Sequence, residues 1–317
     1  MKIVILDSYA ANPGDLEWDT LLELGNCTLY DRTAKEQVIE RAKEANIILT
    51  NKVVFNRELI EALPNLKYIG VMATGYNTID VEAAKEHGIV VTNIPAYSTN
   101  SVAQMVFSHI LTIMQNVQLH SQLVHEGKWS NSPDFCFWKT PILELHGKTI
   151  GIVGLGSIGK AVARIASGFG LKIMAYTSKS KLQLQPEIKK VELDELFKEA
   201  DIVTLHCPLN KETRNMVNLD RLKTMKESSI LINTGRGPLI NEEDLAYALK
   251  NKLIYAAGLD VLSKEPPLAD NPLFGLDNCF ITPHIAWASQ SARGRLMEIL
   301  IGNVKAFIDG KPINQVS

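Results

Sequence analysis

The stretch Thr149–Gly159 reads TIGIVGLGSIG, and it joins a short apolar run to three glycines at GxGxxG spacing. The run is rich in β-branched residues, which is typical of a strand buried on both faces of a parallel sheet. Apolar residues at helical spacing follow in KAVARIASGFG. Gly154, Gly156 and Gly159 would then allow a tight turn, close approach of a pyrophosphate, and close packing of helix on strand. The N-terminus of that helix would present free N–H groups to an anion.

A GxGxxG motif also occurs in ordinary glycine-rich turns, so its surroundings decide its meaning. Here a strand precedes the motif, a helix follows it, and a second apolar strand, Leu171–Tyr176, ends about 20 residues further on. This is the order of a dinucleotide-binding βαβ unit. We therefore favour a cofactor-binding turn over a plain turn.

Short apolar runs alternate with helical patterns along the rest of the chain. Before the glycine turn, strands are expected at Lys2–Leu6, Asn46–Thr50, Leu66–Met72 and Ile89–Thr92, with helices at Asp15–Leu24, Glu36–Glu44 and Val81–Glu86. From the turn onward, strands are expected at Ile150–Val153, Lys172–Tyr176, Ile202–His206, Ile230–Asn233, Ala256–Leu259 and Cys279–Thr282, with helices at Leu193–Glu199, Asp220–Met225 and Glu242–Lys250. The βαβ alternation implies parallel sheets.

Two further helical patterns suggest the domain organisation. One long helix is expected over Ser98–Glu126, and the final helix, Gln290–Asp309, follows the last strand and is expected to cross back to the first sheet. The predicted fold is α/β, with two Rossmann-like, doubly wound parallel-sheet domains. A discontinuous, flavodoxin-like domain would comprise residues 1–97 plus 289–317, and a dinucleotide-binding domain residues 98–288.

Composition narrows the class of protein. A chain of 317 residues with 46% hydrophobic and 21% charged residues is long enough for two ordinary globular domains. Its net charge of −2 argues against a nucleic-acid partner. The apolar run in MKIVILDSY is too short for a signal peptide, and no stretch is long enough to span a bilayer, so a cytoplasmic location is expected. Cys27, Cys136, Cys207 and Cys279 lack CxxC spacing, so we expect reduced cysteines and no metal site.

Polar residues follow three of the expected strands at their carboxyl ends, where open parallel sheets bind ligands. Arg236 stands between two glycines, Asp260 leads on to Glu265, and His284 follows a proline. Each residue alone has an ordinary explanation as an exposed turn, a solvated loop or a hydrogen-bonded bystander. Their joint placement on one sheet edge favours a catalytic site.

Several long segments resemble the D-isomer-specific 2-hydroxyacid dehydrogenase family, and the resemblance runs nearly end to end. The segments are IGIVGLGSIG with AYTS downstream, MKESSILINTGRGPLINEEDL, AAGLDVLSKEPP and ITPHIAWAS. The tail PHIAWAS and the stretch TNKVV are most similar to the glycerate dehydrogenase and hydroxypyruvate reductase branch. Two residues depart from the family pattern: Gln104 stands where Glu is frequent, and Thr177 where NAD-dependent members usually have Asp.

The resemblance implies a catalytic trio of Arg236, Glu265 and His284. Hydride transfer to a 2-keto acid builds negative charge on the keto oxygen, so a proton donor is needed beside it, and histidine suits that role near neutral pH. Glu265 would orient the ring and favour the imidazolium. Arg236 would hold the substrate carboxylate or keto oxygen with a planar fork that Lys cannot reproduce.

The resemblance also assigns binding residues. Backbone N–H groups of Ala73, Thr74 and Gly75 would receive the substrate carboxylate, and Lys52 and Trp287 are equally open to a substrate-facing or a packing role. The cofactor-binding residues would be Gly154, Leu155, Gly156, Ser157, Ile158, Gly159, Thr177, Ser178, Lys179, Cys207, Pro208, Thr234, Gly235, Arg236, Asp260 and His284.

These assignments imply reversible reduction of a small 2-keto acid, with hydroxypyruvate and glyoxylate as the expected substrates. A phosphoglycerate dehydrogenase would be expected to have a longer chain or more basic residues for the phosphate. A formate dehydrogenase would be expected to have Gln in place of Glu265. A dinucleotide-sensing corepressor would be expected to have a tail that recruits its partners. The sequence disfavours each of these three alternatives on the feature named, and turnover with a panel of keto acids would separate them from the expected activity.

Two features predict the cofactor preference and the assembly. Thr177 stands where NAD-dependent members usually have an aspartate, so the carboxylate that would repel a 2′-phosphate is missing, and Lys179 and Lys181 follow it. NADPH is therefore expected to be preferred, with NADH still accepted. The aromatic-rich segment with Trp129, Phe135, Phe137 and Trp138 predicts a homodimer formed through the cofactor domain.

Overall fold

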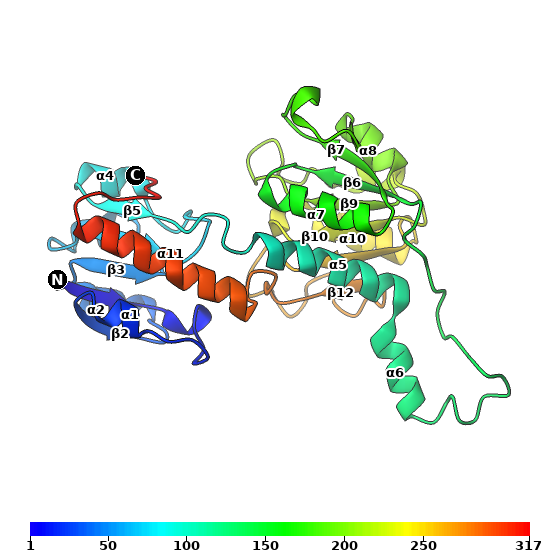
Figure 1. The fold of residues 1–317 in the computed structure, drawn as a ribbon, viewed down its shortest axis with the longest axis horizontal. Coiled ribbons are helices and arrows are strands. Elements are labelled where there is room, and N and C mark those ends of the chain that lie inside the picture. The colour runs from blue at the N-terminus through cyan, green and yellow to red at the C-terminus, as the bar shows by residue number, and fades with distance from the viewer. The chain divides into compact units, whose positions relative to one another are not determined.

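A computed structural model describes residues 1–317, which form two compact units (Figure 1). The terminal unit comprises Met1–Ser98 and Trp287–Ser317, and the central unit comprises Thr99–Ala286. The terminal unit therefore includes Ser98, Trp287 and Ala288, which the sequence predicted in the dinucleotide-binding domain. Trp287 belongs to the terminal unit because its ring meets that of Tyr97 edge-on, with centroids 6.4 Å apart.

The terminal unit contains a five-stranded, wholly parallel sheet in the order β2-β1-β3-β4-β5. Its strands are β1 (Lys2–Ile5), β2 (Asn26–Leu29), β3 (Ile47–Thr50), β4 (Tyr68–Val71) and β5 (Val90–Thr92). Its helices are α1 (Asp19–Leu22), α2 (Val38–Ala42), α3 (Arg57–Glu61), α4 (Val81–Glu86) and α11 (Gln290–Ile308), with short 3-10 turns η1 (Ser8–Ala10) and η2 (Lys35–Gln37).

Both faces of this sheet are apolar. Along β1, Val4 packs in the cluster that includes α2, α3 and α4, while Ile3 and Ile5 pack in the cluster that includes α1 and α11. Successive side chains of a strand point to opposite faces, so this alternation requires helices on both sides. The C-terminal helix thus supplies one of the two helical layers of the terminal unit, and this makes the unit discontinuous in sequence.

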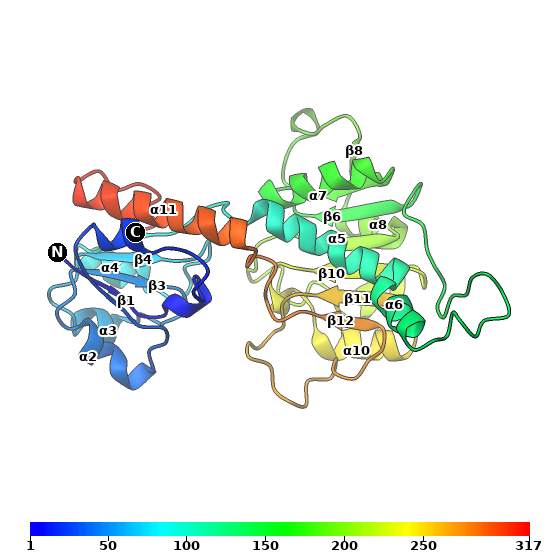
Figure 2. The same cartoon turned by 60° about the horizontal axis from the view of Figure 1, so that its bottom comes forward.

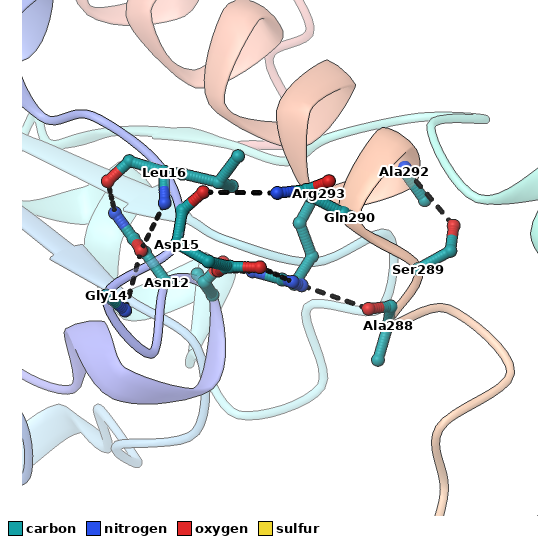
Figure 3. Close-up of polar contacts among 10 residues, drawn as sticks. Asn12, Gly14, Asp15, Leu16, Ala288, Ser289, Gln290, Ala292 and Arg293 are labelled. Carbon is teal, nitrogen blue, oxygen red and sulfur yellow. Dashed lines mark hydrogen bonds and ion pairs between the residues drawn. The ribbon is translucent and has the colours of Figure 1, made fainter.

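Polar contacts attach α11 to the rest of the terminal unit at both ends. At its beginning, Arg293 pairs with both carboxylate oxygens of Asp15 at 2.6 Å, and Ser289 caps the helix by accepting from the N–H of Ala292 (Figure 3). Towards its end, the buried Asn303 donates to the backbone carbonyl of Asn93 at 2.9 Å. Burying an amide side chain is tolerated because it is hydrogen-bonded.

The central unit contains a seven-stranded parallel sheet in the order β12-β11-β10-β9-β6-β7-β8 (Figure 2). Its strands are β6 (Thr149–Val153), β7 (Lys172–Tyr176), β8 (Ile188–Lys190), β9 (Ile202–Leu205), β10 (Ile230–Asn233), β11 (Ala256–Leu259) and β12 (Cys279–Ile281). Its helices are α5 (Thr99–Gln115), α6 (Val117–His125), α7 (Ser157–Gly168), α8 (Leu193–Glu199), α9 (Leu219–Thr224) and α10 (Glu242–Lys250), with 3-10 turns η3 (Lys181–Gln183) and η4 (Gly237–Leu239).

The two faces of the central sheet are covered by different helices. Helices α5 and α7 share one core cluster with the sheet, and α8, α9 and α10 share the other. The chain runs outward from β6 through β7 to β8, and then returns to β9 on the opposite side of β6. This reversal of strand order beside β6 is the position at which doubly wound sheets bind ligands. The predicted fold class, two parallel-sheet α/β domains, is confirmed.

Several predicted elements were wrong. The sequence missed β2 and β8, which are short edge strands without an apolar run. The helix predicted over Asp15–Leu24 is reduced to α1, because Asn12 accepts from the N–H of Leu16 and holds that segment in a turn. The single long helix is divided into α5 and α6 at Asn116, which has the left-handed φ of 47°. No helix is long and apolar enough to cross a membrane.

Candidate active site

The glycine turn lies between β6 and α7. Gly154 has a φ of 95°, and a Cβ there would lie 2.7 Å from the backbone carbonyl oxygen of His206. A Cβ on Gly159 would lie 2.2 Å from the carbonyl oxygen of Gly154, so these two positions allow close packing of the turn on β9 and of the helix on the turn. A Cβ on Gly156 would meet nothing within 4 Å. Gly156, the middle glycine of the motif, therefore faces open space, where a ligand can approach the backbone.

The surroundings of the turn fit a dinucleotide. Helix α7 begins after Gly156 with no side-chain cap and no acidic residue in its first turn, so its first N–H groups and its dipole are available to a pyrophosphate. At the end of β10, the hydroxyl of Thr234 is buried without a hydrogen-bond partner. A buried hydroxyl without a partner is destabilising unless a ligand satisfies it. The residues present fit the predicted cofactor at both places.

The loop after β7 carries the residues predicted at the adenosine ribose. Thr177 Oγ1 accepts from the N–H of Lys179 at 3.3 Å, and the ammonium of Lys190 donates to the carbonyl of Lys179 at 2.6 Å. No Asp or Glu occurs between Tyr176 and Pro186. The loop therefore offers hydroxyls and ammonium groups and no carboxylate.

Two cofactor candidates from the sequence have ordinary packing contacts. Cys207 is half-buried with Sγ 3.7 Å from the sulfur of Met216, and burial raises the pKa of its thiol. Leu155 is buried in the core cluster beneath α5 and α7. Pro208, in contrast, is exposed.

The side chains of His284 and Glu265 are in direct contact. Nδ1 of His284 lies 2.6 Å from Oε2 of Glu265, and both side chains are about one-third exposed, at 30% and 35%. The other carboxylate oxygen of Glu265 accepts from the N–H of Leu262 at 3.1 Å. Because Nδ1 is engaged by the carboxylate, Nε2 is the ring nitrogen left to exchange a proton with a substrate.

Arg236 lies on the adjoining loop, after β10. Its guanidinium is exposed and donates to the carbonyl of Gly235 at 2.8 Å. The buried Asn233 holds this turn, since its side chain accepts from the N–H of Gly235 and donates to the carbonyl of Arg236. A Cβ on Gly237 would lie 2.0 Å from the carbonyl of Leu262, so the Arg236 loop packs closely on the segment that leads to Glu265. Sequence reasoning missed the role of Asn233, because it reads as the last residue of an apolar strand.

Asp260 lies at the end of β11 and is only 1% exposed. Sequence reasoning placed it at the nicotinamide end of the cofactor. In the structure its carboxylate accepts from the hydroxyl of Thr282 at 2.6 Å and from the N–H groups of Ile285 and Ala286 at 2.9 and 2.8 Å. The observed contacts of this side chain therefore go to the segment around His284.

In the terminal unit, the loop after β4 holds Ala73, Thr74 and Gly75. The Thr74 hydroxyl donates to the carbonyl of Ile94 at 2.7 Å, and the N–H of Ile94 donates to the carbonyl of Ala73 at 3.0 Å. The loop is thus fixed by its carbonyl and hydroxyl groups, which leaves backbone N–H groups to receive an anion.

The loop after β3, which carries Lys52, is held by an aspartate that sequence reasoning missed. Asp7 accepts from the N–H groups of Asn51 and Lys52 at 2.8 and 2.6 Å. Burial raises the pKa of Asp7, and these hydrogen bonds act in the opposite direction. Asn51 also donates to the carbonyl of Met72 at 2.6 Å, which connects this loop with the end of β4. The Lys52 side chain is left exposed, and Trp287 packs on Tyr97.

Comparison with known proteins gives consistent matches. The model of the family "D-isomer specific 2-hydroxyacid dehydrogenase, NAD binding domain" matches residues 107–286. A hydroxypyruvate reductase of Blautia hydrogenotrophica is 49% identical over the full length of both chains. A glycerate dehydrogenase of Methylorubrum extorquens is 40% identical, over 99% of this chain and 98% of the relative. An acyclic imino acid reductase solved in complex with NADPH and D-Arg is 34% identical, with a TM-score of 0.86 over the full length of both chains.

Proposed function

The chain belongs to the D-isomer-specific 2-hydroxyacid dehydrogenase family, and from this premise we propose that it reduces hydroxypyruvate and glyoxylate to D-glycerate and glycolate with NAD(P)H. The observation that carries the proposal is the His284–Glu265 pair, 2.6 Å apart in the same unit as the glycine turn. The names of the relatives support the substrate class, since they include a hydroxypyruvate reductase and a glycerate dehydrogenase.

In this proposal His284 is the general acid. A nicotinamide held beside Thr234 and His284 would supply the hydride that reduces the keto carbon. As negative charge develops on the keto oxygen, Nε2 of His284 donates a proton to it, and in the reverse direction the same nitrogen removes the proton from the hydroxyl. Glu265 fixes the ring through Nδ1 and stabilises the imidazolium by its charge. Arg236 binds the substrate carboxylate or keto oxygen through its planar guanidinium.

The substrate carboxylate also requires hydrogen-bond donors. We assign this role to the backbone N–H groups of Ala73, Thr74 and Gly75, supported by the contacts that fix their loop. Lys52 and Trp287 are proposed as further substrate-binding residues, with less support, because the observed contacts of Trp287 are packing contacts.

For the cofactor, we assign the pyrophosphate to Gly154–Gly159 and the adenosine ribose to Thr177, Ser178 and Lys179. We assign the nicotinamide end to Thr234, Gly235, Arg236, Asp260 and His284, with Cys207 and Pro208 beside the adenosine. NADPH is the preferred cofactor in this proposal, because the loop after β7 contains two lysines and no carboxylate that would repel a 2′-phosphate. Among the structural neighbours, one was solved with NADPH and others with NAD, so they support a nicotinamide dinucleotide, and the preference rests on the loop after β7 alone.

We also propose a homodimer formed through the central unit. Helix α6 and the segment after it extend away from the rest of that unit (Figures 1 and 2). Phe135, Trp138 and Trp129 in this segment are 91%, 65% and 52% exposed. Exposed aromatic clusters of this kind are usually covered by a partner. Sedimentation should give a dimer at micromolar concentration, and a monomer would contradict the proposal. The cytoplasmic location stays a prediction, which cell fractionation would test.

Steady-state turnover with a panel of 2-keto acids and both reduced cofactors tests the function. Hydroxypyruvate and glyoxylate should give the highest kcat/KM. A preference for the phosphorylated substrate would favour a phosphoglycerate dehydrogenase, oxidation of formate would favour a formate dehydrogenase, and cofactor binding without any turnover would favour a dinucleotide-sensing protein.

A further inference from the structure

The segment Thr282–Ala286 holds His284 in an unusual conformation. Its φ of 54° lies in the left-handed region, which residues other than glycine rarely adopt. Such a backbone conformation persists only where the surrounding structure fixes it. The N–H groups of His284, Ile285 and Ala286 all donate to Asp260, the first to its backbone carbonyl at 2.8 Å and the other two to its carboxylate. One buried residue thus binds three successive N–H groups around the proposed acid.

The hydrogen bonds continue beyond Asp260 into helix α5. The Thr282 hydroxyl donates to Oδ1 of Asp260 at 2.6 Å, and Nε2 of His109 lies 3.1 Å from the same hydroxyl oxygen. Because the hydroxyl proton is committed to the carboxylate, the hydroxyl oxygen must accept from His109, so Nε2 of His109 carries the proton. His109 is 4% exposed, and its burial lowers the pKa of its imidazole although the charge of Asp260 acts against this. The ring is therefore a neutral donor at pH 7.

Helix α5 reaches this segment at a second point. The hydroxyl of Ser101, about two turns before His109, donates to the carbonyl of Ala286 at 2.6 Å. The approach of α5 to the sheet is close, because a Cβ on Gly258 of β11 would lie only 2.7 Å from Cβ of His109. The glycine lets His109 lie against the strand beside β12. The His284 segment is thus held from α5 near both of its ends.

We propose that His109, together with Ser101, is a positioning residue that holds His284 in its left-handed conformation through Thr282 and Asp260. His109 itself touches neither the ring of His284 nor a substrate; it acts by fixing the backbone from which that ring projects. The inference rests on the proposed function only in giving His284 a catalytic role. The hydrogen-bonded chain itself does not depend on the substrate.

Two substitutions at His109 separate positioning from packing. His109→Met keeps an unbranched side chain of similar length but removes the donor, whereas His109→Gln retains an N–H donor near the position of Nε2. In His109→Met we expect kcat for keto-acid reduction to fall about tenfold, with a smaller change in KM, since a small misplacement of a catalytic group is sufficient for a loss of this size. His109→Gln should recover most of the loss. Ser108→Ala, an exposed serine of the same helix, is the matched control and should behave as the wild type.

Amide hydrogen exchange supplies a readout that needs no turnover. Exchange at Ile285 and Ala286 should accelerate about tenfold in His109→Met and in Ser101→Ala, and return towards the wild-type rate in His109→Gln. Exchange in β10 and β11 should stay unchanged. If His109→Met does not fold, Thr282→Val breaks the same chain with nearly the same side-chain shape.

The outcomes distinguish this inference from the proposed function. Unchanged exchange and unchanged kcat in a folded His109→Met protein would overturn it. So would faster exchange throughout the central unit that His109→Gln fails to restore, because this would show a general packing role. If the wild type reduces no keto acid but Ile285 and Ala286 respond as expected, the positioning chain stands and the proposed function fails.

Discussion

Two loops at the carboxyl ends of the strands of the central sheet differ in how their backbones are fixed: one is bound by a buried carboxylate and the other is not. The loop after β12 presents His284, and its N–H groups are bound by the buried Asp260. The loop after β7 presents Thr177–Lys181. Its contacts include a long 3.3 Å contact between Lys179 and Thr177, one ammonium contact from Lys190, and local hydrogen bonds from Ser180 to the side chain of Gln183, none of them to a buried carboxylate. Both loops lie at the carboxyl-end edge of the sheet, which is the edge where open parallel sheets bind their ligands.

The difference matches two different physical requirements. Proton transfer needs a donor at a fixed distance and angle, so the residue that performs it is supported by a buried hydrogen-bond network. Discrimination between two cofactors that differ by one phosphate needs only a charge of the right sign near that phosphate. A residue in an exposed loop can be substituted by one of different charge without disturbing the core. We expect substitutions in the first loop to affect catalysis, and those in the second to affect selectivity.

The largest effect is expected from removing the acid. His284→Ala should lower keto-acid reduction by roughly 100- to 10,000-fold, because general acid catalysis contributes about that much, while the Kd of the reduced cofactor changes little. Steady-state kinetics and fluorescence titration of the cofactor measure the two quantities. His87→Ala, at an exposed histidine at the end of α4, serves as the control. Reduction near the wild-type rate in His284→Ala would mean that another group is the acid.

Charge at the second loop is expected to change selectivity by about tenfold to a hundredfold. Thr177→Asp places a carboxylate where a 2′-phosphate would bind, and juxtaposed like charges destabilise a complex by several kcal/mol at most. The ratio of kcat/KM for NADPH to that for NADH should fall, while kcat with saturating NADH changes little. Thr177→Asn, of similar size and uncharged, should leave the ratio near the wild-type value. A strong NADH preference in the wild type would show that Thr177 was misinterpreted.

A smaller effect is expected from neutralising the partner of the acid. Glu265→Gln keeps a side chain of the same shape but removes the negative charge 2.6 Å from Nδ1, so the ring loses the carboxylate that orients it and stabilises its charged form. We expect kcat/KM for keto-acid reduction to fall by about tenfold. Steady-state kinetics of the variant and the wild type measure the change. An unchanged kcat/KM would remove Glu265 from its proposed role.

The same contrast explains what the sequence could predict. The β6–α7 turn is encoded in contiguous residues, so its strand, glycines and helix were predictable from Thr149–Gly170. The supports of the catalytic loop are single polar residues that meet only in the folded chain: Asp260 and Ala286 are 26 positions apart, and His109 and Thr282 are 173 apart. No local pattern identifies such partners. Asn116 was missed because one left-handed residue leaves the apolar pattern on both sides of it intact.

The smallest expected effect concerns stability, and it tests whether the catalytic loop depends on a buried neutral histidine. Burial lowers the pKa of His109 in the folded chain, whereas in the unfolded chain an imidazole titrates near pH 6.5. Below about pH 6.5 the unfolded state therefore binds a proton that the folded state resists, and the free energy of unfolding falls as pH decreases, by at most about 1.4 kcal/mol per unit for one proton.

His109→Gln cannot titrate, so its free energy of unfolding should fall less steeply than that of the wild type between pH 7 and pH 5. Urea midpoints at several pH values measure the two slopes. A slope will persist in the variant, because other groups contribute to it. One of these groups is the half-buried His206, since loss of hydration lowers the pKa of its imidazole to about 4. The difference between the two slopes isolates His109, since contributions common to both proteins cancel. Thr177→Asn, in the exposed loop, should reproduce the wild-type slope. Equal slopes for wild type and His109→Gln would show that His109 takes up its proton equally in the folded and unfolded chains, and would exclude the neutral donor assigned to it.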